Sequence, residues 1–250
     1  MSKLIKSQKE IEAMRESGRI AALILKQLTE AAKPGVTTLE LDALAEELIH
    51  QHGVKHAFKD YDGFPGVLCT SVNDIIVHGV PNDTALKDGD IVGLDFGVIL
   101  DGWYSDTAVT VGVGEISHEA RRLMQVTKKA LRLGIKKAKP GSTTGDIGNT
   151  IERYVESEGY SIVRDLVGHG VGKKLHEEPQ VPNWGKRHTG TVLEVGMVIA
   201  IEPMVIDGPS NAIKLDSDKF SYKSADGSLT AHFEHTVAIT EQGPKILTQV

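Results

Sequence analysis

The sequence contains a single cysteine, Cys69, so no disulfide can form within the chain. A lone cysteine favours a reducing compartment. The first ten residues lack the apolar core of a signal peptide, and no run approaches the roughly 18 apolar residues of a membrane span. We therefore expect a cytoplasmic protein without a membrane partner.

The chain also lacks an excess of positive charge. Its 250 residues carry a formal net charge of -6 at pH 7, and the pI is about 5.9. Domains that bind nucleic acids or anionic membranes non-specifically are usually basic. Nucleic acid is therefore not an expected substrate. The 40% of hydrophobic residues is enough for an ordinary packed core.

Several catalytic motifs are missing as well. The sequence has neither the phosphate-binding Gly-x-x-x-x-Gly-Lys-Ser/Thr nor the Gly-x-Ser-x-Gly of serine hydrolases. It has no His-Glu-x-x-His, and Pro179, three residues after His176, would break the helix which that motif requires. A nucleotide-binding loop, a serine nucleophile and a mononuclear zinc protease of that type have no support in the sequence.

The most informative stretch that is present runs from residue 93 to residue 107. Two apolar runs flank Asp101-Gly102, a dipeptide that predicts a hairpin because both residues tolerate positive φ. With a two-residue turn, Asp106 opposes Gly97, and Asp95 shares the face of Gly97. The two aspartates are then diagonal neighbours on one face. On this observation alone, a solvent-facing pair and a buried metal-binding pair are equally good interpretations.

The second half of the chain repeats this pattern. Residues 86–95 and 106–111 resemble residues 193–202 and 234–239. Glu202 therefore falls where Asp95 does, and Glu234 falls where Asp106 does. Four converging carboxylates would repel one another, and a pair of divalent cations is the usual compensation. The repeat thus favours a metal site over solvated surface.

Helix signals follow the same repeat. Capping boxes open predicted helices at Ser7 and Thr37, and a third helix is expected over residues 117–139. The dipeptide Pro34-Gly35, which ends the first predicted helix, recurs as Pro140-Gly141 after the third. Strands are expected at residues 67–72 and 75–78, and the polar segment 207–228 is expected to be a surface excursion with a hairpin.

These patterns predict a mixed α/β (α+β) fold and one catalytic domain, residues 1–250, made of two similar halves. The halves, about 1–114 and 115–250, would meet around the four carboxylates. His169 belongs to the same candidate site, because Gly168-His169-Gly170 places it in a glycine-flanked turn where bulky packing cannot be its purpose.

Seven ordered segments resemble the motifs of the type I methionine aminopeptidases: residues 77–81, 94–97, 105–107, 168–172, 176–179, 201–204 and 233–236. The resemblance covers essentially the whole chain. It implies the duplicated pita-bread fold, in which helices cover a curved antiparallel sheet. The chain has neither the zinc-binding extension of eukaryotic type I enzymes nor the helical insertion of type II, so the compact bacterial form is expected.

The resemblance also implies a dinuclear metal centre. Its ligands would be Asp95, Asp106, His169, Glu202 and Glu234. In that family Asp106 and Glu234 would bridge two divalent ions. One imidazole and four carboxylates suit cobalt, manganese, iron or zinc, and affinity order alone does not choose among them.

The implied reaction is removal of the initiator methionine from nascent chains with a small second residue. A metal-activated water would attack the first peptide bond, and Glu202 would accept its proton. His78 would contact the scissile amide, and His176 would lie near the carbonyl oxygen. The methionine pocket would be lined by Phe58, Tyr61, Phe64, Cys69, Leu175 and Phe220. The family further implies a monomer that contacts the ribosome transiently.

Three alternatives compete with this interpretation. An Xaa-Pro peptidase of the same fold would usually carry an extra N-terminal domain. A non-catalytic binding protein of the fold would typically have lost metal ligands, whereas all five positions are filled here. The carboxylates taken alone would also fit a dinuclear phosphoesterase.

Overall fold

The computed structural model describes residues 4–250. Within this range it contains four α-helices: α1 (Gln8–Ala31), α2 (Thr38–Gln51), α3 (His118–Lys137) and α4 (Thr144–Ser157). The predicted capping boxes are present at Ser7 and Thr37, and a third box opens α4 at Thr143. In each box the hydroxyl accepts from the third backbone N–H of the helix, which fixes where the helix begins.

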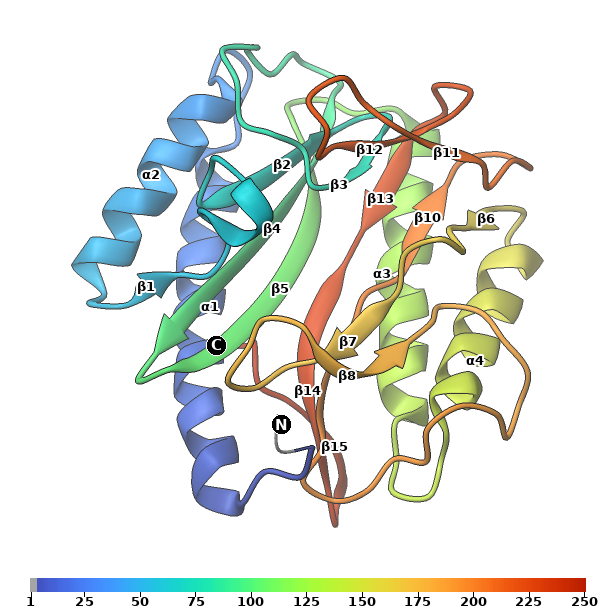
Figure 1. Cartoon of the computed structure of the whole chain (residues 1–250). Coiled ribbons are helices and arrows are strands. Elements are labelled where there is room, and N and C mark those ends of the chain that lie inside the picture. The colour runs from blue at the N-terminus through green and yellow to red at the C-terminus, as the bar shows by residue number, and fades with distance from the viewer. Residues whose placement is uncertain (1–3) are drawn as a thin grey trace.

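A nine-stranded antiparallel sheet forms the centre of the molecule, in the order β1-β4-β5-β14-β9-β7-β8, with β2 paired to β4 and β15 to β14. Its strands are β1 (Lys55–His56), β2 (Leu68–Val72), β4 (Ile91–Leu100), β5 (Trp103–Gly112), β7 (Gly168–Gly170), β8 (Glu177–Val181), β9 (Val198–Ile201), β14 (Glu234–Thr240) and β15 (Gly243–Ile246). Figure 1 shows α1 and α2 on the side of β4, and α3 and α4 on the other side, beyond β14.

Two smaller sheets accompany it. One has the order β13-β10-β6 and the other β11-β12-β3. Their strands are β3 (Ile75–Val77), β6 (Ser161–Ile162), β10 (Met204–Ile206), β11 (Ile213–Leu215), β12 (Tyr222–Ser224) and β13 (Thr230–His232). The prediction of a mixed fold with an antiparallel sheet and covering helices is confirmed.

The hairpin predicted around Asp101-Gly102 is present. Strands β4 and β5 pair with Gly97 opposite Asp106 and Leu100 opposite Trp103. Asp101 and Gly102 have φ angles of 50° and 74°, the left-handed values that a two-residue turn of this kind requires. The register therefore places Asp95 and Asp106 on one face of the sheet, as expected.

The sequence repeat is also a repeat in hydrogen bonding. Gly35 N donates to Leu86 O at 2.8 Å, and Gly141 N donates to Leu193 O at 2.8 Å. These residues hold equivalent positions in the two halves, after α1 and after α3. Each half also has its own apolar core, one between α1, α2 and β4, the other between α3, α4 and β9. Both observations agree with the prediction of two similar halves.

The segment 207–228 contains the expected hairpin, formed by β11 and β12, but it is more than a surface excursion. Strand β12 also pairs with β3, with Tyr222 opposite Val77. The Ser221 hydroxyl donates to His78 O at 3.4 Å, so the segment packs against the loop that carries His78. The polar sequence concealed this role because the pairing partner lies more than 140 residues away in the chain.

No helix among residues 4–250 combines the length and apolar content needed to cross a bilayer.

Candidate metal centre

Five predicted ligands come together on neighbouring strands of the central sheet. Asp95 lies on β4, Asp106 on β5, Glu234 at the start of β14, and His169 on β7, while Glu202 directly follows β9. Strands β4, β5, β14, β9 and β7 are consecutive in the sheet order. All four carboxylates are buried. Residues from both halves are thus placed side by side because the sheet is continuous between them.

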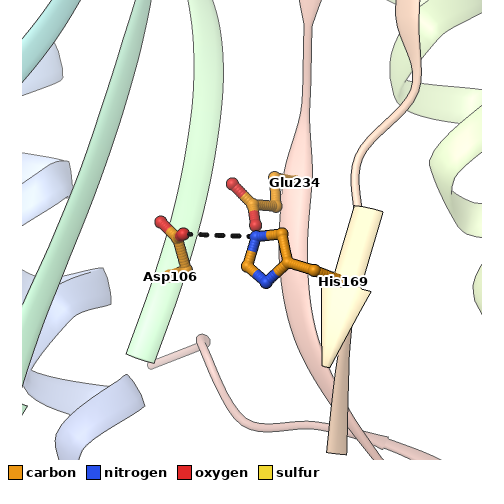
Figure 2. A group of neighbouring side chains, drawn as sticks. All are labelled: Asp106, His169 and Glu234. Carbon is orange, nitrogen blue, oxygen red and sulfur yellow. Dashed lines mark ion pairs between the residues drawn. The ribbon is translucent and has the colours of Figure 1, made fainter. Parts of the chain in front are cut away.

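The geometry around His169 suits a metal ligand. Its Nε2 atom lies 3.5 Å from Glu202 Oε1 and 3.8 Å from Asp106 Oδ2. Figure 2 shows the imidazole facing Asp106 and Glu234, and the ligand atoms of these three residues lie within 4.8 Å of one another. His169 Nδ1 is 3.0 Å from Gly170 O. If Nδ1–H donates to that carbonyl, Nε2 carries no hydrogen and its lone pair faces the carboxylates. A metal-binding histidine needs such a tautomer, in which the nitrogen that faces the metal is unprotonated.

Three buried carboxylate oxygens have no hydrogen-bond donor among the described residues, which indicates that the site holds a cation. Asp95 Oδ1, Asp106 Oδ1 and Glu234 Oε1 are fully buried and accept no hydrogen bond from any residue the structure describes. An unpaired buried carboxylate costs several kcal/mol unless a cation compensates it. Hard oxygen donors with one imidazole match first-row divalent cations. The residues present therefore fit a divalent metal centre.

The ionisation of these carboxyl groups reflects their crowding. Burial raises the pKa of Asp95 to about 6. Burial and the charges of neighbouring carboxylates raise the pKa of Asp106 and of Glu234 well above the usual range. Burial acts in the same direction on Glu202, but the nearby imidazoles of His232 and His169 outweigh it and lower its pKa. Glu202 is thus the carboxylate that ionises most readily.

A cavity of about 630 Å³ contains the whole predicted site. All five proposed ligands line it, and so do His78, His176 and the six predicted pocket residues, Phe58, Tyr61, Phe64, Cys69, Leu175 and Phe220. Met204 and Leu166 also line it and were not predicted. The carboxylates and the apolar wall therefore share one cavity.

His176 and His78 both face this cavity. His176 Nδ1 lies 2.8 Å from the Tyr61 hydroxyl, and its ring centroid lies 4.3 Å from that of His169. Both residues keep exposed surface. Partial loss of hydration in the cavity and the nearby His169 lower the pKa of His176 to about 4, and partial loss of hydration lowers the pKa of His78. Both imidazoles are therefore neutral near pH 7.

The apolar wall is a small cluster of its own. Phe58, Phe64, Cys69 and Leu175 are buried together, and the half-buried Phe220 ring stands edge-on to Phe64 with centroids 5.6 Å apart. Burial raises the pKa of the Cys69 thiol well above its ordinary value, so the thiol is neutral and acts as an apolar wall. Cys69 pairs with Asp95 across β2 and β4, which places this wall directly beside the carboxylates.

The prediction that His169 lies in a flexible turn is wrong, because it lies in strand β7. Its glycine neighbours serve close strand packing instead. A Cβ on Gly168 would lie 2.5 Å from Ala200 O, and a Cβ on Gly170 would lie 2.1 Å from Glu178 O. Larger residues would push β8 and β9 away from β7 and move the imidazole.

His232 was not predicted and is part of the same cluster. It is buried, and its Nε2 lies 3.5 Å from Glu202 Oε2. One signal could have found it, since it stands two residues before Glu234 and alternate residues of a strand share a face.

Comparison with known proteins identifies the family. Residues 12–241 match the sequence profile of metallopeptidase family M24. The chain belongs to this family. A Clostridium perfringens protein named methionine aminopeptidase is 49% identical to it over 247 residues, 99% of each chain. The crystal structure of a methionine aminopeptidase from Thermotoga maritima superposes with a TM-score of 0.97 at 43% identity, covering 100% of both chains.

A more distant relative, a prolidase, matches over only part of its own length. The prolidase of Pyrococcus horikoshii matches with a TM-score of 0.80 at 27% identity, and the match covers 99% of this chain but 64% of the prolidase. This metallopeptidase therefore matches the methionine aminopeptidases over their full length, and the Xaa-Pro alternative is not favoured. The pita-bread fold and the resemblance inferred from the seven motifs are confirmed.

Proposed function

We propose that the protein is a metal-dependent aminopeptidase that removes the N-terminal methionine from polypeptides with a small second residue. The observation that carries this proposal is the shared cavity, in which an imidazole and four carboxylates adjoin a buried apolar wall. The names of the full-length relatives point to the same reaction. Both halves supply ligands, so we propose that residues 1–250 act as a single catalytic domain.

In this proposal Asp95, Asp106, His169, Glu202 and Glu234 would hold two divalent ions. When bound, such ions polarise the scissile carbonyl and acidify a water molecule. The unpartnered oxygens of Asp95, Asp106 and Glu234 support these assignments. Cobalt, manganese, iron and zinc all suit this donor set.

The side chains around the ligands have separate tasks. The lowered pKa of Glu202 keeps its carboxylate ionised, so it can accept a proton from the attacking water. If the Tyr61 hydroxyl donates to His176 Nδ1, the other ring nitrogen carries the hydrogen and can donate to the substrate carbonyl as negative charge develops there. His78 lines the same cavity and is assigned to the scissile amide.

Specificity for methionine is assigned to the apolar wall. A flexible thioether packs well against aromatic rings, and Phe58, Phe64 and Phe220 provide them. Nascent polypeptides that begin with methionine are the proposed partners. Transient contact with the ribosome, a monomeric state and a cytoplasmic location remain predictions from the sequence.

The experiment that tests the proposal is hydrolysis of Met-Ala-Ser, Leu-Ala-Ser, Pro-Ala-Ser and Ala-Pro peptides by the manganese-loaded protein. Release of methionine alone is expected. Preferential cleavage of Ala-Pro would instead indicate an Xaa-Pro peptidase, and hydrolysis of an aryl phosphate would indicate a phosphoesterase. Metal binding without any hydrolysis would favour a non-catalytic binding protein.

Metal affinity is expected to fall as the pH falls through about 6, the raised pKa of the proposed ligand Asp95. The pKa values of Asp106 and Glu234 are raised, so protons compete with the metal for these carboxylates in a range where ordinary carboxylates are already ionised. Calorimetric titration with Mn²⁺ in two buffers of different ionisation enthalpy should show proton release at pH 6. A dissociation constant that is unchanged between pH 5.5 and 7.5, without proton release, would contradict the assigned ligands.

Substituting Phe220 by alanine is expected to relax the selectivity for methionine. Phe220 is half-buried at the mouth of the pocket, so its removal widens the site and leaves the core of the fold intact. We expect kcat/KM for Met-Ala-Ser to fall about 10-fold, and that for Phe-Ala-Ser to fall less or to rise. The exposed Leu215 on the same hairpin is a matched control, since Leu215→Ala should change neither value. An unchanged preference in Phe220→Ala would remove Phe220 from the pocket.

A further inference from the structure

An ion pair is buried beneath the loop that carries His176. Lys6 Nζ lies 2.8 Å from Glu177 Oε2, and each side chain is only 2% exposed. Across residues 4–250, the lysines and arginines of the other ion pairs are at least 25% exposed. A buried ion pair seldom stabilises a fold more than an apolar pair would. Its position therefore calls for another explanation.

The Glu177 carboxylate organises the loop from Gly172 to His176. Its Oε1 atom accepts hydrogen bonds from Lys173 N at 2.8 Å and from Lys174 N at 3.2 Å. A Cβ on Gly172 would lie 2.6 Å from Glu177 Oε2, so the carboxylate fills the space beneath the loop. Glu177 Oε1 thus accepts hydrogen bonds from the loop backbone, while Oε2 pairs with the Lys6 ammonium.

The two ends of this arrangement are fixed to the sheet. Tyr104 N donates to Gly172 O at 2.9 Å, which joins the loop to the β4–β5 hairpin. Lys6 N donates to Gly196 O at 2.8 Å, which joins the N-terminal segment to the turn before β9. The Lys6 ammonium is consequently held at a fixed point under the loop, and the loop presents His176 to the cavity.

We propose that Lys6 is a positioning residue for His176, acting through the Glu177 carboxylate. Lys6 does not line the cavity, whereas its partner Glu177 does, so we assign the effect of Lys6 to Glu177 and the loop that it holds. The expected loss of turnover rests on the proposed function. The expected effect of Lys6 on the loop from Gly172 to His176 does not depend on it. A displacement of a catalytic group by about 1 Å can cost on the order of 10²-fold in rate.

The kinetic test is a double-mutant cycle between Lys6→Gln and His176→Ala. We expect Lys6→Gln to lower kcat for Met-Ala-Ser by about 10²-fold with little change in KM. In the His176→Ala background the same substitution should cost less than about twofold, since no oriented imidazole remains to be misplaced. The exposed Lys9, on the same segment, is the matched control, and Lys9→Gln should leave kcat unchanged. Equal losses in both backgrounds would overturn the proposal.

A second readout does not depend on activity. Hydrogen exchange at the Lys173 and Lys174 amides should accelerate at least about 10-fold in Lys6→Gln, whereas exchange in the β4–β5 hairpin and the affinity for Mn²⁺ stay the same. Unchanged exchange at these two amides would overturn the proposal. If the wild-type protein released no methionine, the proposed function would fail and the exchange result would still decide the role of Lys6.

The variant Lys6→Gln/Glu177→Gln covers the case in which the single substitution does not fold, because it removes both charges of the pair together. Its kcat is expected to fall as well, since a neutral pair holds the loop less firmly. Wild-type kcat in this folded double variant would overturn the proposal.

Discussion

We expect Asp106→Asn to abolish methionine release and at the same time to stabilise the metal-free protein. Asp106 is a proposed metal ligand, and losing it would remove Lewis-acid assistance worth several kcal/mol, so a fall in kcat/KM of at least about 10³-fold is expected. The same carboxylate is buried, carries an unpartnered Oδ1 and faces other carboxylates. An amide in its place can donate hydrogen bonds to those neighbours.

The stability gain has a definite dependence on pH. The pKa of Asp106 is raised in the folded state, so the folded protein binds this proton more tightly than the unfolded chain does. Its ionisation therefore destabilises the metal-free fold increasingly as the pH rises through the folded pKa. The free energy of unfolding of Asp106→Asn should exceed that of the wild type at pH 7.5, and the difference should be smaller at pH 5.

Urea denaturation of both metal-stripped proteins, together with a Met-Ala-Ser assay, measures the two effects. The control is Asp83→Asn, an exposed aspartate away from the cavity, which should change neither. Full activity of Asp106→Asn, or a variant less stable than the wild type at pH 7.5, would contradict the assignment.

Glu202→Gln is expected to lower kcat by about 10³-fold with a smaller change in metal affinity. Glu202 is assigned both as a ligand and as the proton acceptor, and general-base catalysis contributes on the order of 10² to 10⁴-fold. Glutamine keeps the size and one ligating oxygen of the side chain but cannot take up a proton at neutral pH. The loss should therefore appear in turnover more than in binding.

The measurement is kcat at saturating Mn²⁺ beside the dissociation constant of Mn²⁺ from calorimetry. A matched control, Glu30→Gln, changes an exposed glutamate of α1 that does not line the cavity, and it should leave kcat within about twofold. If Glu202→Gln retained wild-type turnover once saturated with metal, another group would have to accept the proton.

The elements with local signals were predictable from the sequence. The β4–β5 hairpin follows from one dipeptide whose residues both adopt positive φ, and that turn alone fixed the register of Asp95 and Asp106. The helix starts at Ser7 and Thr37 follow from side chains that cap their own backbone within three residues. The internal repeat then extended the inference to Glu202 and Glu234.

The features that sequence reasoning missed depend on distant partners. Strand β12 is positioned by its pairing with β3, which lies far away in the sequence. The Lys6–Glu177 ion pair likewise joins residues that are 171 positions apart. His169 was misplaced for a related reason. Glycine is common both in turns and where strands approach closely, and only the positions of Ala200 and Glu178 decide between the two.

The most direct test of the account is to titrate the metal-stripped protein with Mn²⁺ and to follow methionine release from Met-Ala-Ser. A dinuclear, metal-dependent aminopeptidase should release no methionine without metal. Its activity should rise to a plateau by two equivalents of Mn²⁺ and be lost again when a chelator is added. Undiminished methionine release by metal-free protein, or a cavity that takes up no metal at neutral pH, would contradict it.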